Sequence, residues 1–298
     1  MVSIILRGGL GNQLFQYATG RAHSLRTNST LFVNLSKLDS NLGPDVAKRS
    51  LHLEAFDLPV EYVDNETSHS FGRTIRRRIP QVVASINQLL ATHLFKLYVE
   101  DQSLTFDPNV PNLPGNVTLD GYWQSERYFT EFTETLRREI TVRNPVSGEN
   151  QRWYDLISDT GSVSVHVRRG DYVDLGWALP PSYYRNALNQ IQDETDVTDL
   201  FFFSDNIDWI RTNQKDLVPD HSDTNVHYVE CNDGETAHED LRLMRACDHH
   251  IVANSSFSWW GAWLDNSETK IVIAPDYWVH DPVNHLDIIP DRWDTVSW

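Results

Sequence analysis

From residue 162 to residue 274 the chain alternates between segments with a strand pattern and segments with a helix pattern. This alternation predicts parallel strands joined by right-handed crossovers, because a parallel partner is reached only by returning across the sheet. The predicted strands are 162–167, 199–204, 225–229, 249–253 and 270–274, and the predicted helices are 181–194, 206–213, 236–247 and 256–265. Open sheets of this α/β class bind ligands at the carboxyl ends of their strands.

Two polar side chains stand at the carboxyl end of the first of these strands. Valine alternates there with polar residues, a period of two that predicts one apolar and one polar face. The polar face ends in His166 and Arg168, and Gly170 then lets the backbone turn. A cationic fork at this position suits a phosphate. The alternative is that Arg168 and Arg169 pair with Asp171 or with other surface acids.

Two further strands bring polar residues to the same edge of the sheet. Residues 200–203 form an apolar run typical of a central parallel strand, and Asp205 follows them. The Asp205 carboxylate suits hydrogen bonds from a base or a ribose, and the alternative is that it is the N-cap of the next helix. Asn254, Ser255 and Ser256 follow a later strand and open a helix, whose N-terminal N–H groups suit an anion.

The amino-terminal residues predict a second turn of this kind. Val2–Leu6 predicts a short buried strand, Gly9 and Gly11 lie in the turn after it, and a helix is predicted from Gln13 to Thr27. The dinucleotide fingerprint is incomplete, since its third glycine would fall at Leu14. This disfavours a nicotinamide- or flavin-dependent dehydrogenase and leaves a simple tight turn as a further alternative.

The predicted domain boundary lies where the helix pattern of the first half ends. Further predicted elements are strands at 30–35 and 116–123 and a helix at 124–142, with a loop-like region at 39–70. Residues 143–148 then break the pattern with Asn, Pro and Gly. Because 298 residues exceed the size at which one core usually keeps growing, we place two domains, at 1–147 and 148–298.

Arg73, Arg76, Arg77 and Arg78 form a basic cluster in this acidic chain, just before a helix predicted to begin at Pro80. Such a cluster suits peripheral contact with an anionic membrane surface or a lipid-linked acceptor. The alternative is a solvated helix end.

The composition restricts the classes of partner. The chain has 42 acidic and 25 basic residues, a net charge of −17, and only five lysines, so nucleic acid is not an expected partner. We interpret the acidic, lysine-poor composition as adaptation to a salty cytoplasm, and ordinary solubility is the alternative. No apolar run approaches the ~18 residues of a membrane span, and Cys231 and Cys247 form no CxxC pair. A soluble protein in a reducing, cytoplasmic compartment is therefore expected.

His249 and His250 are adjacent in a predicted strand, so they face opposite ways and cannot chelate one metal together. Trp259, Trp260 and Trp263 are interpreted as core residues rather than as a sugar platform.

Four ordered motifs carry a family resemblance. They are GGLGNQLFQY at 8–17, HVRRGDY at 166–172, FSDN at 203–206 and ANSSFSWWGAW at 253–263. The sequence resembles glycosyltransferase family 11, the α-1,2-fucosyltransferases, from residue 2 to about residue 275. This resemblance implies a GT-B architecture: two facing Rossmann-like domains with parallel sheets and the active site in the cleft between them. The N-terminal domain would lie on the acceptor side, and the C-terminal domain would bind GDP-fucose.

The activity implied by the resemblance is inverting transfer of L-fucose from GDP-fucose to the 2-hydroxyl of a galactose-type acceptor, in glycan or surface-polysaccharide synthesis. The alternatives are another GDP-sugar-dependent glycosyltransferase, for example one using GDP-mannose, or a non-catalytic sugar-nucleotide or glycan-binding protein.

The resemblance also implies residue roles. Arg168 matches an arginine set against the donor diphosphate, Asp205 and His166 match positions that hold the guanine and ribose, Ser255 and Ser256 fall in a phosphate-contacting motif, and Asn12 matches an asparagine that faces the donor across the cleft. The predicted catalytic residues are Arg168, His166 and Asn12. The predicted substrate-binding residues are Gly9, Gly11, Asn12, His166, Arg168, Asp205, Asn254, Ser255 and Ser256. Arg169 is expected to serve packing or an ion pair near the site, with an acid such as Asp171.

The chemistry of the donor agrees with these roles. Breaking a sugar-nucleotide bond leaves negative charge on the diphosphate, and enzymes stabilise that charge either with Mg²⁺ or with protein cations and helix N–H groups. The sequence has no Asp-x-Asp pair to hold a metal, so we expect transfer without a metal or other cofactor. The acceptor hydroxyl needs either a base, for which His166 and Asp171 are candidates, or an already loosened, cationic sugar.

Overall fold

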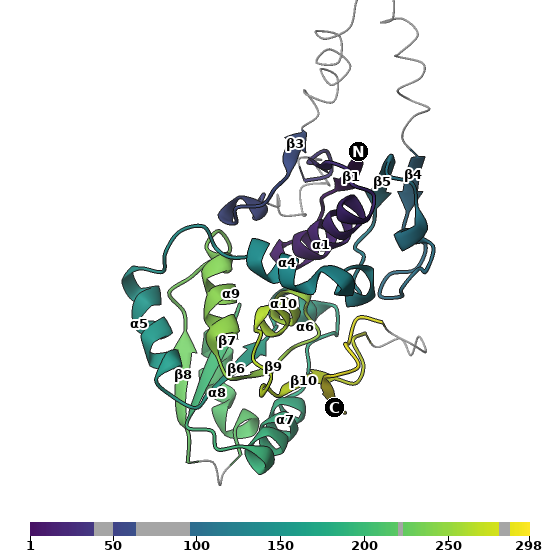
Figure 1. Ribbon diagram of the computed structural model, residues 1–298. Helices are drawn as coiled ribbons and strands as arrows, with labels where there is room; N and C mark the ends of the chain where they lie inside the picture. Colours follow the sequence, from purple (N-terminus) through teal and green to yellow (C-terminus); the bar gives the residue numbers. More distant parts are fainter. Residues whose placement is uncertain (39–49, 64–95, 220–222, 280–286) are drawn as a thin grey trace, which may run out of the picture. The chain divides into compact units, whose positions relative to one another are not determined.

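The computed structural model describes residues 1–38, 50–63, 96–219, 223–279 and 287–298. The chain divides into two compact units, Met1–Glu139 and Ile140–Trp298, each with a parallel sheet (Figure 1). The expectation of two parallel-sheet α/β domains is therefore confirmed. The division falls between residues 139 and 140, whereas the sequence predicts it between 147 and 148. The arginine cluster at 73–78 and the helix predicted from Pro80 lie outside the described residues.

The first unit has a five-stranded sheet in the order β3-β2-β1-β5-β4, with every pair parallel. Its strands are β1 Val2–Ile5, β2 Leu31–Asn34, β3 Glu61–Val63, β4 Lys96–Val99 and β5 Val117–Asp120. Helix α1, Leu10–Arg26, packs on β1 and β2 so closely that a Cβ on Gly20 would overlap the Ile4 and Leu31 side chains. This helix begins at Leu10, three residues before the predicted start.

The helix predicted at 124–142 is wrong for most of its length. The structure has 3-10 turns at Glu126–Tyr128 and Thr130–Phe132, followed by the short helix α4, Thr133–Glu139. The Arg26 guanidinium donates to the Tyr128 carbonyl at 2.8 Å and so occupies an acceptor that a continuous helix would use internally. Because Tyr128 and Phe129 are both buried, tertiary packing overrides the helical period of this segment.

Strands β3 and β4 form the two edges of this sheet, and neither is predicted from the sequence. Most of their side chains are exposed. Edge strands with little burial carry no apolar alternation, so the period that identifies a strand is missing from them.

The second unit has a six-stranded parallel sheet in the order β11-β10-β9-β6-β7-β8. Its strands are β6 Ser162–Val167, β7 Asp199–Ser204, β8 Asn225–Val229, β9 His249–Ile251, β10 Val272–Pro275 and β11 Asp294–Val296. Its helices are α5 Gly148–Ser158, α6 Gly170–Asp174, α7 Pro181–Glu194, α8 Ile207–Leu217, α9 Ala237–Ala246 and α10 Ser256–Leu264. The predicted strands and helices of this half are confirmed, with shifts of a few residues at some ends. Elements α5, α6 and β11 are present in the structure but were not predicted from the sequence.

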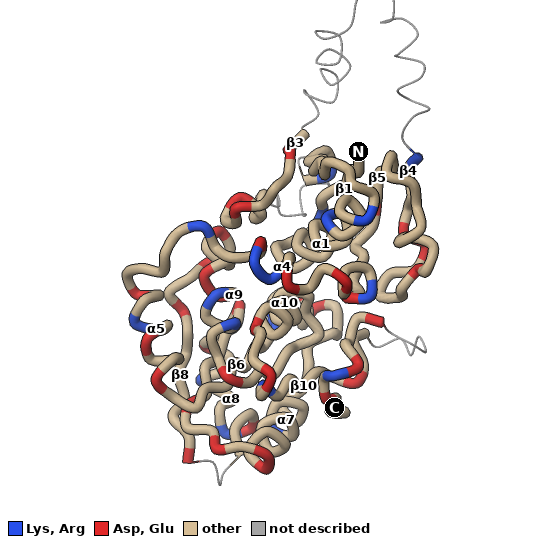
Figure 2. Tube along the Cα trace, in the orientation of Figure 1, with Lys and Arg blue, Asp and Glu red and all other residues tan. Residues whose placement is uncertain are grey.

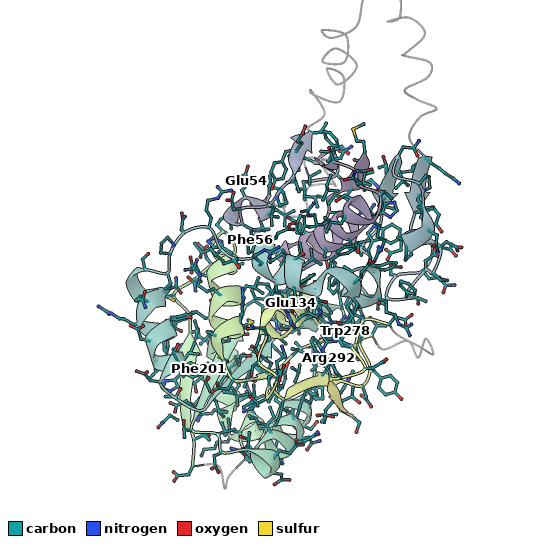
Figure 3. The ribbon with its side chains drawn as sticks, in the orientation of Figure 1. Glu54, Phe56, Glu134, Phe201, Trp278 and Arg292 are labelled. Atoms are coloured by element: carbon teal, nitrogen blue, oxygen red, sulfur yellow. The ribbon has the colours of Figure 1, made fainter. Side chains whose placement is uncertain are left out.

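Helices cover both faces of this sheet. Buried residues of α7 and α8 pack with the valines of β6 on one face. On the other, Phe201, labelled in Figure 3, packs with residues of α5 and α9. The polar face predicted for β6 is therefore buried rather than open to solvent: Ser164 and His166 are 4% and 6% exposed.

The two adjacent histidines of β9 have separate partners in neighbouring elements. The His250 ring contacts the Ser164 hydroxyl at 2.9 Å through Nδ1 and Asp265 at 3.1 Å through Nε2. His249 points elsewhere, because its Nδ1 accepts from the Ile271 N–H at 3.0 Å. The two rings thus have separate partners, as expected of adjacent strand residues whose side chains face opposite ways.

The tryptophans of α10 lie in the core. Trp259, Trp260 and Trp263 are fully buried, and the Trp259 ring stacks on Trp263 with centroids 5.9 Å apart. The core interpretation of these residues is confirmed. Cys231 and Cys247 are both free.

Acidic residues occur along both units (Figure 2). In the described part of the chain, no helix combines the length and the apolar character needed to cross a bilayer.

Candidate functional site

Three neighbouring strands of the second unit end at one edge of its sheet. β6 lies between β9 and β7, with Val165 paired to Ile251 and Val167 paired to Ser204. Arg168, Asp205 and the segment 254–256 follow these strand ends. The convergence predicted for these residues therefore holds within this unit.

Arg168 is ion-paired in the structure. Its Nη1 lies 2.7 Å from Asp205 Oδ2, and its Nη2 donates to Asp171 Oδ1 at 2.6 Å. The guanidinium also lies over the Tyr172 ring, 5.3 Å from the centroid. The alternative of pairing with nearby acids is thus realised for Arg168, whose side chain is 29% exposed at the strand end.

Arg169 has a different environment. Its guanidinium lies over the Trp209 ring at 3.9 Å, so the packing role predicted for it is realised. The ion pair with Asp171 belongs to Arg168 instead. Asp171 lies three residues after Arg168, and its carboxylate reaches that guanidinium. Arg169 leaves the strand on the opposite face, because successive side chains of a strand alternate between its two faces.

Asp205 is not the N-cap of the helix that follows it. Asn206 has that place, and its Oδ1 accepts from the Trp209 N–H at 3.0 Å. The second oxygen of Asp205, Oδ1, accepts from the Arg169 backbone N–H at 2.8 Å. The carboxylate therefore joins the end of β7 to the turn after β6.

The turn after β6 uses Gly170 for space. Among the described residues, positive φ angles at glycine occur at Gly8, Gly148 and Gly176, and not at Gly170. A Cβ on Gly170 would lie 2.5 Å from Asp205 Oδ2. Gly170 therefore supplies space at the turn rather than an unusual φ angle, because the Asp205 carboxylate packs against its Cα.

His166 is buried beneath this edge. Its ring meets the Phe257 ring edge-on, with centroids 5.7 Å apart. Burial, with a smaller contribution from the Arg168 charge, lowers the pKa of His166 to about 3. The imidazole is therefore neutral at ordinary pH, and it cannot neutralise a diphosphate by its own charge.

The residues before α10 anchor a loop and open a helix. Asn254 Nδ2 donates to the carbonyls of Trp177 at 3.0 Å and Trp278 at 3.2 Å; Trp278 is labelled in Figure 3. Ser255 is the N-cap of α10, and its hydroxyl accepts from the Phe257 N–H at 3.4 Å. Ser256 is the first residue of this helix, so the positive end of its dipole lies at this strand end.

The predicted residues of the first unit stand at the start of α1. Gly8 has φ +76°, Gly9 is the N-cap, and Gly11 and Asn12 lie in the first helical turn rather than in a loop before it. The Asn12 side-chain oxygen accepts from Gln124 Nε2 at 2.9 Å. No described residue has an atom within 4 Å of the position of a Cβ on Gly9, so this part of the structure leaves the backbone open to a close approach there.

A charged cluster at the carboxyl edge of this sheet was missed by sequence reasoning. Asp120, at the end of β5, forms ion pairs with Arg7 and, at 2.8 Å, with Lys37. Nearby, the Glu100 carboxylate accepts from the N–H groups of Tyr122 and Trp123 at 2.7 and 2.9 Å. Arg7, directly after the predicted strand Val2–Leu6, was the available signal; Asp120 lies inside the predicted strand 116–123, and Glu100 follows a strand that was not predicted.

The described residues contain no group of three or more His, Cys, Asp and Glu side chains arranged to hold a metal ion.

The comparisons with known proteins define the class of this chain. The sequence model of glycosyl transferase family 11 matches residues 73–294, so most of the chain is covered. The chain is 34% identical over 300 residues to an α-1,2-colitosyltransferase of Escherichia coli, covering 98% of this chain and 97% of that protein. It is 24% identical over 281 residues to galactoside 2-α-L-fucosyltransferase Sec1 of Mus musculus, covering 90% and 66%.

Among solved structures, a mutant of Arabidopsis thaliana FUT1 in complex with GDP shares the fold, with a TM-score of 0.52 and 11% identity over 94% of this chain and 72% of that one. These relatives place the chain among the sugar-nucleotide-dependent glycosyltransferases. It belongs to glycosyl transferase family 11, a family of the α-1,2-fucosyltransferase type, and the resemblance noted in the sequence is confirmed.

Proposed function

We propose that this protein transfers L-fucose, with inversion, from GDP-fucose to the 2-hydroxyl of a galactose-type acceptor in glycan or surface-polysaccharide synthesis. The observation that carries the proposal is the juxtaposition of Arg168 and the N-terminal end of α10 at one sheet edge of a family 11 chain. Both features stabilise the negative charge that develops on a leaving diphosphate.

In the proposed reaction the bond between the fucose anomeric carbon and the diphosphate breaks as the acceptor hydroxyl attacks from the opposite face. The Arg168 guanidinium bridges phosphate oxygens, and the α10 terminus adds its N–H groups. A His166 ring with a pKa of about 3 binds a proton too weakly to act as an effective base. The proposal therefore favours the other route to the acceptor hydroxyl, an already loosened, cationic fucose that needs no strong base. Asn12, Gly9 and Gly11 are proposed to contact the donor from the first unit.

Several accompanying proposals rest on composition and family membership. We propose a GT-B arrangement with the active site in the cleft between the two units, no metal or other cofactor, and a cytoplasmic location. The arginines at 73–78 are proposed to make peripheral contact with the inner face of a membrane.

The donor sugar has one specific competitor. The relative with 34% identity is named a colitosyltransferase, and colitose is fucose without its 3-hydroxyl. Other GDP-sugars, and binding without catalysis, are the remaining alternatives. An enzyme discriminates strongly between two donor sugars that differ by one hydroxyl only if its site hydrogen-bonds that hydroxyl.

The test is release of GDP from GDP-fucose, GDP-colitose and GDP-mannose against a panel of galactosides, with the product linkage read by NMR. The proposal expects the highest kcat/KM with GDP-fucose and an α-1,2-linked product. A preference for GDP-colitose or GDP-mannose would contradict the proposed donor. A product with another linkage would contradict the proposed 2-hydroxyl acceptor. GDP binding without release from any donor would indicate a binding protein.

A further inference from the structure

Arg168 is held between two carboxylates that come from different parts of the fold. Asp205 follows β7 and contacts Nη1 at 2.7 Å, while Asp171 lies in α6 and contacts Nη2 at 2.6 Å. With both in place, the guanidinium has no uncompensated positive charge. A diphosphate that binds the two terminal nitrogens of Arg168 therefore competes with these carboxylates.

The Asp205 carboxylate is fixed on three sides. Oδ2 faces the Arg168 guanidinium, Oδ1 accepts from the Arg169 N–H at 2.8 Å, and the Gly170 Cα packs against it so closely that a Cβ there would collide with Oδ2. Moving this carboxylate would leave a backbone N–H without its acceptor. Asp205 therefore holds both the turn after β6 and the arginine that the turn presents.

The Asp171 carboxylate is held less firmly. Its side chain is 53% exposed, and within the described residues its carboxylate contacts Arg168 through Oδ1. An exposed ion pair contributes little free energy, so water and a stronger anion can replace this contact.

We infer that Asp205 is a positioning residue that holds Arg168 for the donor diphosphate, and that Asp171 is the counter-ion that the diphosphate replaces. The inference rests on the proposed function, because it requires a diphosphate at Arg168. It departs from the nucleoside contact that the family resemblance implies for Asp205. The two carboxylates then have opposite effects on the donor, which can be measured.

The first experiment separates the charge of Asp205 from its position. Asp205→Asn keeps an oxygen for the Arg169 N–H but turns an amide N–H toward Nη1 of Arg168. Gly170→Ala displaces the carboxylate and keeps its charge. Both variants should lower turnover of GDP-fucose by roughly 10²-fold, the loss typical of a misplaced catalytic group, with less than about tenfold change in GDP affinity by calorimetry.

The matched control is Asp208→Asn. Asp208 lies in the first turn of α8 and is 96% exposed, so this variant removes the same charge without touching Arg168. It should leave turnover and GDP affinity unchanged. Melting curves on every variant show whether the fold is retained.

The second experiment is a double-mutant cycle between Arg168→Lys and Asp205→Asn. If Asp205 acts through Arg168, the double variant should lose no more turnover than Arg168→Lys alone. Independent, multiplying losses would overturn the positioning role. So would an Asp205→Asn protein that keeps its turnover and loses only GDP affinity, which is the result for a nucleoside contact.

The third experiment tests the replaceable counter-ion. Asp171→Asn should bind GDP roughly 2- to 5-fold more tightly, because a competing anion is gone. Weaker binding would overturn this half of the inference. If instead Arg168→Lys alone leaves turnover normal, the diphosphate is elsewhere, and the proposed function of Arg168 fails rather than the role of Asp205.

Discussion

Replacing His166 with asparagine should make the free energy of unfolding fall less when the pH is lowered from 8 to 5. In the folded chain, burial, helped by the Arg168 charge, lowers the pKa of this histidine to about 3, whereas the unfolded chain titrates near 6.5. Below pH 6.5 the unfolded state therefore binds a proton that the folded state rejects. Stability is lost as the pH falls from 6.5 toward 3, and it is fully present above 6.5.

The magnitude follows from the unfolded value. At pH 5, one and a half units below 6.5, the loss from this group is about 2 kcal/mol, and at pH 8 it is close to zero. Any folded-state pKa below about 4 gives the same loss at pH 5. Burial also lowers the pKa values of His23, His249 and His250, but these residues are present in both proteins and cancel in the comparison.

The assay is urea denaturation of the wild type and His166→Asn at pH 8 and pH 5. The difference at pH 8 measures the packing lost with the ring, and the wild type should lose about 2 kcal/mol more than the variant on going to pH 5. NMR titration of the wild type should show a His166 ring that keeps its neutral shift down to pH 5. If the wild type and His166→Asn lose the same free energy of unfolding between pH 8 and pH 5, the argument that burial keeps His166 neutral is refuted.

Further predictions concern the site and the surface. Arg168→Lys should lower turnover on the order of 10²-fold with little change in Tm, since an ammonium cannot bridge two oxygens as a planar fork. Normal turnover of this variant would show that the diphosphate does not bind at this strand end. Arg169→Lys should instead lower stability by up to about 1 kcal/mol through its contact with Trp209, seen in melting curves, and a large loss of turnover at full stability would contradict that role. EDTA should leave GDP release intact, and a loss that Mg²⁺ or Mn²⁺ restores would count against leaving-group stabilisation by arginine and helix. Tm should rise between dilute buffer and molar KCl, because salt shortens the screening length from ~10 Å at 0.1 M to ~3 Å at 1 M; a flat or falling curve argues against halophilic adaptation.

The predictable parts of this fold are those with a local period. Leu200–Phe203 is apolar because β7 is buried on both faces, and the βα alternation that contains it predicts every strand of the second unit's sheet except β11. Edge strands such as Lys96–Val99 bury little and carry no such period. The helix predicted at 124–142 fails where tertiary contacts intervene: Tyr128 and Phe129 are buried, and Arg26, about a hundred residues away in sequence, donates to the Tyr128 carbonyl.

The sequence by itself determined which residues reach the sheet edge, because side-chain parity and strand ends are local properties of Arg168, Asp205 and Ser255. Only the tertiary structure decided what those residues do there. Asp205 and Arg169 are 36 positions apart, and their contact exists because β7 pairs with β6 in one register. The neutral state of His166 likewise depends on helices packing over both faces of β6, since desolvation is a property of the assembled fold and not of the strand.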